Sequence, residues 1–351
     1  MPPATIRIGV IGAGDNARRK HLPFLQKING VEVVGVVNRS PASSRRVATE
    51  FGIPKIYKHW PELIADESLD AVLIGTWPYL HCAATLSALE QGKHTLCEAR
   101  MAMNAREAHA MLDAAQRRPE LVTQLVPSPS GLLCDYWIRE QLAKGLLGQI
   151  YEVAVLARAG TLADPAAPHT WRTKKEYSGQ NIMMLGIHHE TVQRWFGDVA
   201  SVSASSRVFS PNRPDPETKK MASSTVPESL FVSAHLTSGI HSLYHLSNVA
   251  LNAGPDRMEI FGSRGTLKIE LWSGRVELAT GKSGSFKQVK VPARLQRHWA
   301  VEEDFIKAIR SVQPIELTTF ADGVRYMEFT EAVNDSLSSG RRVALPLKHD
   351  C

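Results

Sequence analysis

Three small residues near the N-terminus stand at a spacing that could hold a dinucleotide. Gly12 and Gly14 directly follow the apolar run of residues 6–11, and Ala17 comes three residues later, giving the pattern G-x-G-x-x-A. In this pattern the first glycine permits a tight turn, and the second lets the backbone approach a pyrophosphate. The small third residue lets the following helix pack against the strand, and that helix presents its N-terminal N–H groups to the phosphates. The spacing therefore predicts a nucleotide site, with an unliganded strand-to-helix turn as the alternative.

The residues after the second predicted strand bear on which cofactor is bound. An acidic residue there would bind the adenosine ribose and repel a 2′-phosphate, but this chain has Asn38, Arg39 and Ser40. Arg39 can stack on adenine or pair with a phosphate, and Ser40 can donate a hydrogen bond. We therefore expect NADP in preference to NAD. In the alternative interpretation Arg39 points into solvent.

Composition and charge narrow the class of protein. The 351 residues are 43% hydrophobic and 22% charged, with a formal net charge of +6. Such a chain is long enough for two domains. Its basic residues form no stripe interleaved with aromatic residues, and no run is long and apolar enough for a membrane span. Cysteines 82, 97, 134 and 351 are too scattered for a metal pair or a disulfide framework. We expect a cytoplasmic protein that binds no structural metal, no nucleic acid and no membrane.

Alternating elements in the first third predict a nucleotide-binding domain over residues 1–127. Apolar runs such as 31–37 and 69–75 alternate with helical segments such as 41–51 and 104–116. Continuous apolar strands separated by helices are typical of a parallel sheet that is covered on both faces. The expected fold of this domain is a doubly wound α/β Rossmann fold.

The pattern changes at Pro127-Ser-Pro-Ser-Gly131, which predicts a second domain over residues 128–351. Residues 231–237 and 241–247 read as an antiparallel hairpin, and further short strands follow it. Helices are expected near 181–196, 298–310 and 320–338, and a surface loop over 210–227. The second domain is therefore expected to be α+β, with an open-faced and mainly antiparallel sheet.

The chain resembles the glucose–fructose oxidoreductase, inositol dehydrogenase and rhizopine-catabolism family (Gfo/Idh/MocA) over essentially its whole length. Besides the glycine pattern, the motifs are Thr76-Trp-Pro-Tyr-Leu-His81, Leu96-Cys-Glu-Ala-Arg-Met101, Trp171-Arg172, Gly186-Ile-His188 and Glu259-Ile-Phe-Gly-Ser-Arg-Gly265. The resemblance implies a Rossmann domain, an open sheet and hydride chemistry with a nicotinamide cofactor. The residues then expected to contact the cofactor are Gly12, Gly14, Asp15, Asn16, Ala17, Asn38, Arg39, Ser40, Thr76, Trp77, His81, Glu98 and Arg100.

Two positions depart from the family pattern of a lysine, an aspartate and a histidine around the substrate. Ala99 stands at the lysine position and Met184 at the aspartate position, so His188 alone of this set is retained. The resemblance implies that His188 takes a hydroxyl proton as hydride leaves. A buried structural histidine is the alternative. Arg172 is a candidate for orienting a substrate hydroxyl or anion, and Tyr177 for donating a phenolic proton.

The leading hypothesis is therefore an NAD(P)-dependent oxidoreductase of a sugar, cyclitol or related polyhydroxy compound, possibly anionic. Two alternatives follow from the missing lysine and aspartate. The protein could use bound NAD transiently as a lyase, glycosidase or epimerase, or it could be a catalytically degenerate sensor or regulator. The expected open sheet has an apolar face that needs cover, so we also expect a homo-oligomer formed through that sheet.

Overall fold

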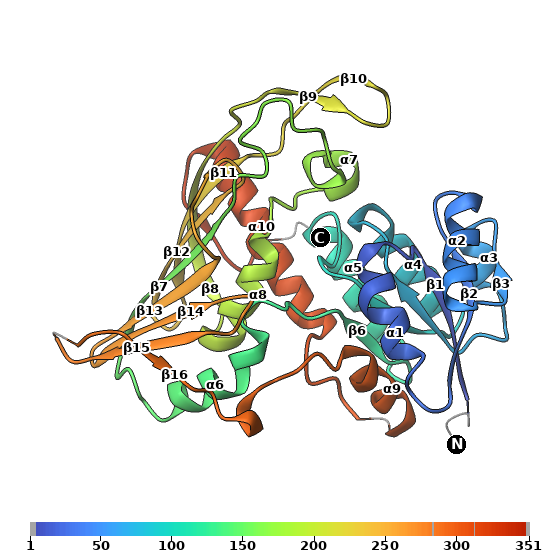
Figure 1. Cartoon of the computed structure of the whole chain (residues 1–351), viewed down its shortest axis with the longest axis horizontal. Helices are drawn as coiled ribbons and strands as arrows, with labels where there is room; N and C mark the ends of the chain where they lie inside the picture. The colour runs from blue at the N-terminus through green and yellow to red at the C-terminus, as the bar shows by residue number, and fades with distance from the viewer. Residues whose placement is uncertain (1–4, 283, 312, 349–351) are drawn as a thin grey trace. The chain divides into compact units, whose positions relative to one another are not determined.

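The computed structural model describes residues 5–282, 284–311 and 313–348, which form two compact units (Figure 1). The first unit comprises residues up to Pro127 together with 300–324, and the second comprises 128–299 together with the residues from Arg325. The chain passes from the first unit to the second after Pro127, returns to the first at Ala300 and rejoins the second at Arg325. Helix α9 (Val301–Ser311) packs against α1 (Leu22–Leu25) of the first unit. Its apolar spacing predicts a helix, but periodicity does not say which core will bury it.

The first unit is built on a six-stranded parallel sheet in the order β3-β2-β1-β4-β5-β6. Its strands are β1 (Ile6–Ile11), β2 (Val31–Val37), β3 (Lys55–Ile56), β4 (Ala71–Ile74), β5 (His94–Cys97) and β6 (Thr123–Leu125). Its helices are α1 (Leu22–Leu25), α2 (Pro41–Phe51), α3 (Trp60–Ile64), α4 (Pro78–Glu90), α5 (Ala105–Gln116) and α9. The strand order reverses between β1 and β4, and open parallel sheets bind ligands at the carboxyl ends of the strands at such a point.

The helix after the glycine turn differs from a regular α-helix. A π-helical turn, η1 (Ala17–His21), precedes α1 and buries Ala17 and His21. Pro23 follows two residues later and has no N–H with which to continue an α-helical ladder. The N–H of Leu22 donates to the carbonyl of Ala17, five residues earlier, which is the hydrogen bond of a π-helix.

The second unit contains a nine-stranded sheet in the order β16-β15-β14-β13-β7-β12-β11-β8-β17, in which the β7–β12 pair is parallel and the other pairs are antiparallel. The strands are β7 (Ile150–Arg158), β8 (Val199–Arg207), β11 (Ser229–Leu236), β12 (His241–Ser247), β13 (Arg257–Gly262), β14 (Gly265–Glu270), β15 (Val276–Thr280), β16 (Lys287–Val289) and β17 (Val343–Ala344). The helices are α6 (Asp135–Ala143), α7 (Lys175–Ser178), α8 (Leu185–Phe196) and, from Arg325 onward, α10 (Phe320–Ser339), with 3-10 turns η2 (Leu132–Cys134), η3 (Trp171–Thr173) and η4 (Ala293–Leu295). The mainly antiparallel sheet expected from the sequence is confirmed.

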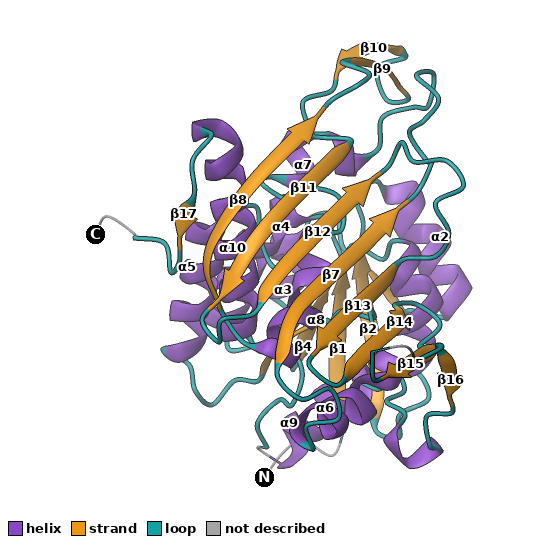
Figure 2. Cartoon of the chain, turned by 90° about the vertical axis from the view of Figure 1, so that its left-hand side faces the viewer, coloured by secondary structure: helices purple, strands orange, loops and turns teal. Residues whose placement is uncertain are grey.

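The two faces of this sheet differ in character. Alternate residues of β11 and β12, such as Val232 and Tyr244, are buried with Val192 of α8 and Phe329 of α10 in one hydrophobic core. Figure 2 looks onto the other face, which lies away from α8 and α10. Leu243 on that face is 48% exposed. The period-2 alternation of an antiparallel strand separates the two sets of side chains.

The segment expected as a surface loop, 210–227, contains a two-stranded hairpin instead. Strands β9 (Asn212–Asp215) and β10 (Lys220–Ser223) pair antiparallel. The prediction was wrong because Arg213 is fully buried and paired with the buried Glu228. Its guanidinium also donates to carbonyl oxygens of residues 162, 164 and 167. A charged residue in a Pro- and Ser-rich segment gives no sign of such burial.

In the described part of the chain, no helix is both long and apolar enough to cross a membrane.

Candidate active site

The glycine turn has the geometry that its sequence requires. Gly12 adopts a positive φ of 83°, and its N–H donates to the carbonyl of Val37 at 2.8 Å. A Cβ on Gly12 would lie 2.5 Å from Cγ2 of Thr76, so a side chain is excluded there. A Cβ on Gly14 would meet no heavy atom closer than 4.0 Å. The backbone beside Gly14 is therefore open to a ligand, which fits a pyrophosphate.

Asn38 and Ser40 shape the turn. The Asn38 side chain accepts the N–H of Ala13 at 2.6 Å and donates to Oγ of Ser43 at 3.0 Å. Ser40 caps α2 by accepting the N–H of Ser43 at 3.3 Å. The expected hydrogen bond from Ser40 to a phosphate competes with this capping role, which stabilises a helix. Ser43 is not among the residues that the sequence predicted for this site. Its position in the first turn of α2, five residues after Asn38, is nevertheless visible in the sequence.

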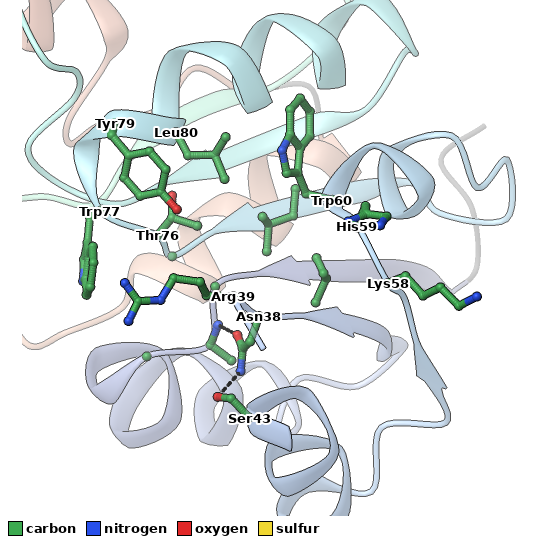
Figure 3. Close-up of a pocket in the computed structure, with 16 residues that line it drawn as sticks. Asn38, Arg39, Ser43, Lys58, His59, Trp60, Thr76, Trp77, Tyr79 and Leu80 are labelled. Carbon is green, nitrogen blue, oxygen red and sulfur yellow. Dashed lines mark hydrogen bonds between the residues drawn. The ribbon is translucent and has the colours of Figure 1, made fainter. Parts of the chain in front are cut away.

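A cavity of about 340 Å³ opens beside the turn (Figure 3). It is lined by the glycine turn, by the residues that follow β2 and β4, and by the β3–α3 loop. The guanidinium of Arg39 lies 5.0 Å from the ring centroid of Trp77, a cation–π arrangement that leaves a flat surface suited to a base. The lining residues that the sequence did not predict are Ser43, Lys58, His59, Trp60, Tyr79 and Leu80. No fixed spacing relates the β3–α3 loop to the glycine turn.

Other predicted cofactor residues lie in the same unit but in different surroundings. Thr76 lines the cavity, whereas His81 is fully buried. The ring nitrogens of His81 face the carbonyl oxygens of Thr76, at 2.9 Å, and of Arg100, at 3.0 Å. His81 therefore ties the turn after β4 to the turn after β5, and its burial leaves no surface for a cofactor. Arg100 is only 3% exposed, and Asp15 is paired with Arg19 at 2.9 Å.

Glu98, at the end of β5, belongs to a cluster of charged side chains. Its carboxylate accepts hydrogen bonds from Asn16 and, at 2.9 Å, from Nε2 of His21. Burial alone would raise the pKa of Glu98, but the hydrogen bond and charge of His21 and the bond from Asn16 lower it. The Glu98 side chain is therefore held as a carboxylate beside the glycine turn.

In the second unit, His188 lies on the inward side of α8 and is fully buried. Its Nδ1 is 3.1 Å from Oγ of Ser130, while its buried Nε2 has no hydrogen-bond partner in the described part of the chain. The rings of His188 and Trp272 form a T-shaped pair, with centroids 6.0 Å apart. Burial lowers the pKa of His188 to about 4, although the charge of Asp256 opposes this shift. The imidazole is therefore neutral near pH 7, with one nitrogen anchored and the other available.

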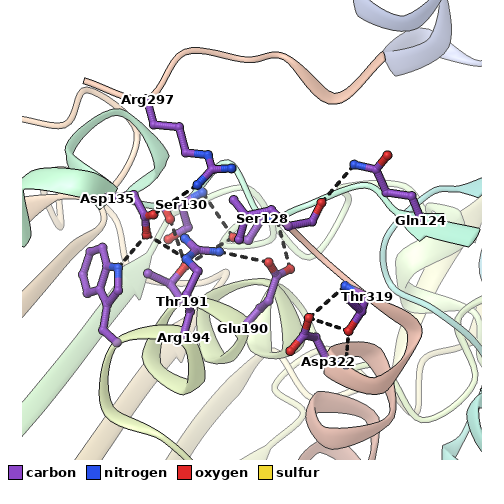
Figure 4. Close-up of polar contacts among 12 residues, drawn as sticks. Gln124, Ser128, Ser130, Asp135, Glu190, Thr191, Arg194, Arg297, Thr319 and Asp322 are labelled. Atoms are coloured by element: carbon purple, nitrogen blue, oxygen red, sulfur yellow. Dashed lines mark hydrogen bonds and ion pairs between the residues drawn. The ribbon is translucent and has the colours of Figure 1, made fainter. Parts of the chain in front are cut away.

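A polar network fixes the loop that carries Ser130 (Figure 4). The N–H of Ser128 donates to Glu190 at 2.9 Å, and the hydroxyl of Thr191 donates to the carbonyl of Ser130 at 2.8 Å. Arg194 donates to both Glu190 and Asp135. The side chains of this network belong to helices α8 and α6. Their hydrogen bonds therefore fix the loop of Ser130 relative to α8, the helix that carries His188.

Arg172 and Tyr177 lie in different surroundings from His188. Arg172 lines a second cavity of about 390 Å³ together with Thr170, Met183, Met184 and Asn248. His188 is not among the described residues that line this second cavity. The hydroxyl of Tyr177 lies 3.5 Å from Glu217, and Lys174 pairs with Asp215 at 2.9 Å. Lys174 thus anchors α7 to the β9–β10 hairpin.

Comparison with known proteins agrees with this architecture. Residues 6–125 match the model of an oxidoreductase family with an NAD-binding Rossmann fold, and residues 137–268 match the GFO/IDH/MocA C-terminal domain. The chain belongs to the GFO/IDH/MocA oxidoreductase family. The resemblance seen in the sequence is thereby confirmed, as is the Rossmann fold of the first unit.

Relatives of this GFO/IDH/MocA protein include an uncharacterized oxidoreductase of Synechocystis sp., 26% identical over 75% of this chain and 71% of that protein. The 1,5-anhydro-D-fructose reductase of Ensifer adhaerens is 30% identical over 54% of this chain and 56% of the reductase. A solved structure of levoglucosan dehydrogenase in complex with NADH and levoglucosan has a TM-score of 0.85. Its sequence is 20% identical to this chain, and the match covers 98% of this chain and 100% of the levoglucosan dehydrogenase chain. This likeness shows the shared fold.

Proposed function

We propose that the protein is an NAD(P)-dependent dehydrogenase or reductase of a cyclic polyhydroxy compound, either a sugar or a cyclitol. The observation that carries this proposal is the open backbone at Gly14 beside the cavity of about 340 Å³, in a chain of this family. The names of the relatives, 1,5-anhydro-D-fructose reductase and levoglucosan dehydrogenase, support a sugar-type substrate and net oxidation or reduction.

Residues of the second unit supply the proton chemistry in this proposal. When bound, the nicotinamide cofactor accepts or supplies the hydride. In the tautomer of neutral His188 that carries its proton on Nδ1, the Nδ1–H donates to Oγ of Ser130, and the lone pair of Nε2 then accepts the proton of the reacting hydroxyl. Arg172 and Asn248 line the second cavity and present donors that can orient other hydroxyl groups or an anionic group.

The proposal is tested by following the near-ultraviolet absorbance of the reduced cofactor. The purified protein is incubated with NADP or NAD and a panel of glucosides, anhydro sugars and inositols. We expect net formation of reduced cofactor with at least one of them. Tight cofactor binding without turnover of any compound would contradict the proposal. Conversion of a substrate with no net change in the cofactor would instead indicate transient oxidation.

We further propose that NADP is preferred over NAD. Arg39, Lys58 and His59 line the first cavity, and its described lining contains no acidic side chain. A 2′-phosphate would therefore meet positive charge without repulsion. Arg39→Ala is expected to weaken NADPH binding about tenfold and to change NADH binding little, because a charge-assisted hydrogen bond is lost. Titration calorimetry measures both affinities.

Arg45→Ala is the matched control for that experiment. Arg45 is an exposed arginine on α2 and does not line the cavity. Its loss should leave both affinities unchanged. An equal loss of NADPH and NADH affinity in Arg39→Ala would argue against phosphate recognition and for stacking on adenine.

We also propose that the open face of the nine-stranded sheet joins copies of this chain. Phe231 and Leu243, on the neighbouring strands β11 and β12, lie on that face and are 45% and 48% exposed, which is unusual for large apolar residues on adjacent strands. Leu243→Lys is expected to shift the protein toward monomers in light scattering. Leu251→Lys is the control, because Leu251 is 69% exposed but lies beyond the end of β12. The same molar mass in solution for the unaltered protein, Leu243→Lys and Leu251→Lys would contradict the proposal.

A further inference from the structure

The first unit buries a histidine between two carboxylates, a feature to which the proposed function gives no role. His21 is fully buried at the end of the π-helical turn. Its Nε2 lies 2.9 Å from Glu98, and its Nδ1 forms a hydrogen bond with Glu302 of α9. These three side chains, the His21 cluster, join the N-terminal turn, the end of β5 and a helix from the far end of the chain.

The contacts of the two ring nitrogens define the charge of His21. An ionised carboxylate oxygen can only accept, so each ring nitrogen that faces one donates a proton, and with both carboxylates ionised the ring is an imidazolium; the Asn16 amide nitrogen also lies 3.4 Å from Nε2. Burial by itself lowers the pKa of His21, but the hydrogen bonds and charges of Glu302 and Glu98 outweigh it and raise the pKa to about 9. The cluster therefore holds two carboxylates against one cation in the unit's interior.

The two carboxylates differ in their exposure. The side chain of Glu302 is 1% exposed, whereas that of Glu98 is 14% exposed. Glu98 also accepts hydrogen bonds from Asn16, two residues after Gly14, and from the N–H of Ala99 at 3.2 Å. Glu302 is thus the buried anchor of the imidazolium, and Glu98 is the member that reaches the surface beside the phosphate turn.

The family resemblance implies that Glu98 contacts the cofactor's nicotinamide-side ribose, and we propose that His21, anchored by Glu302, is the positioning residue that holds Glu98 in place to accept a hydroxyl there. The proposal rests on the proposed function, since it requires a dinucleotide at the glycine turn. Strands β1, β4 and β5 are adjacent and parallel, so their carboxyl ends bring Gly14, Thr76 and Glu98 to one edge of the sheet. A ligand that begins at Gly14 and continues along this edge passes Glu98.

Loss of the His21 proton has a directional consequence. A neutral ring keeps one N–H and turns a lone pair toward the other carboxylate, which then repels it. Glu302 cannot reach water, whereas Glu98 can be hydrated, so Glu98 is the carboxylate that is released. Ribose binding should therefore weaken as the pH rises through about 9, the pKa of His21.

Two ligands that differ by one ribose test this proposal. ADP-ribose carries the second ribose and ADP does not, so the ratio of their affinities reports the Glu98 contact. For His21→Gln we expect ADP-ribose affinity to fall about tenfold and ADP affinity to stay within about twofold, as loss of a charge-assisted hydrogen bond predicts. Arg19→Gln is the control, because Arg19 also lies on η1 but its side chain is 77% exposed. It should leave the ratio unchanged.

A pH series on the unaltered protein provides the second measurement and needs no variant that must fold. ADP-ribose affinity should drop as the pH rises through about 9 while ADP affinity does not, and His21→Gln should lack this step. Glu302→Gln should move the step to lower pH, because the imidazolium loses its buried partner. Equal losses for both ligands, or a flat ADP-ribose profile, would overturn the positioning role. Failure of the unaltered protein to bind either ligand would overturn the proposed function itself.

Discussion

His188→Ala is expected to lower the turnover number about a hundredfold or more while leaving cofactor affinity unchanged. General-base catalysis by a positioned histidine contributes about this much or more. The substitution removes the buried Nε2, which has no hydrogen-bond partner among the residues that the structure describes. Steady-state kinetics with the substrate identified from the panel, together with cofactor titration, would separate the two effects.

The neighbouring histidine provides the control. His189 is also buried, but it stacks on Phe329 and hydrogen-bonds Tyr244 at 2.8 Å. His189→Gln should therefore lower thermal stability and leave turnover within about threefold, because it alters packing and not the proposed base. If both variants lose activity equally, His188 is a structural residue.

The pH profile gives an independent test of the same role. Burial lowers the pKa of His188 to about 4, so the neutral form persists well below the ordinary value of 6.5. The acid limb of kcat/KM should accordingly lie below pH 6.5. The buried, neutral His188 also favours folding above pH 6.5, and this contribution is lost as the pH falls toward 4. Activity should be compared only where circular dichroism shows the native fold.

Gly14→Ala is expected to weaken cofactor binding about tenfold or more without destabilising the protein. A Cβ at Gly14 meets no heavy atom closer than 4.0 Å, so the folded chain accepts the methyl group. The methyl group would instead occupy the space through which a pyrophosphate approaches the backbone, and such crowding costs a few kcal/mol. Calorimetric titration with NADPH and thermal unfolding would measure the two quantities.

Gly12→Ala provides the contrast, because both the cofactor affinity and the stability of the folded protein should fall. At Gly12 the positive φ of 83° and the 2.5 Å approach to Thr76 make any side chain strained in the folded protein itself. We expect a loss of about 2 kcal/mol or more in the free energy of unfolding. Gly52→Ala shares the positive φ but has no heavy atom within 4 Å and lies outside the cavity lining, so only its small stability cost is expected. Unchanged NADPH affinity in Gly14→Ala would contradict a pyrophosphate site at this turn.

Local patterns in the sequence determined several features of this protein. The apolar run before Gly12 predicts β1, and the helix predicted over 41–51 is α2, with Gly52 in the left-handed conformation after its last residue. Residues 241–247 form β12 as predicted. In each case the signal lies within a few residues, because strand alternation, helix caps and turn glycines are properties of the local backbone.

Other features were decided only by the tertiary structure. His21 and Glu302 are 281 positions apart, and His188 and Ser130 are 58 apart. Neither pairing has a local signature, because each depends on which core buries a helix and on which strands are neighbours. The same holds for Arg213, whose burial turned an expected loop into a hairpin. The sequence by itself determined the glycine turn at which we propose that a dinucleotide meets the backbone. The tertiary structure decided which distant side chains hold Glu98 and His188, since the charge and hydrogen bonds of a buried group depend on what surrounds it.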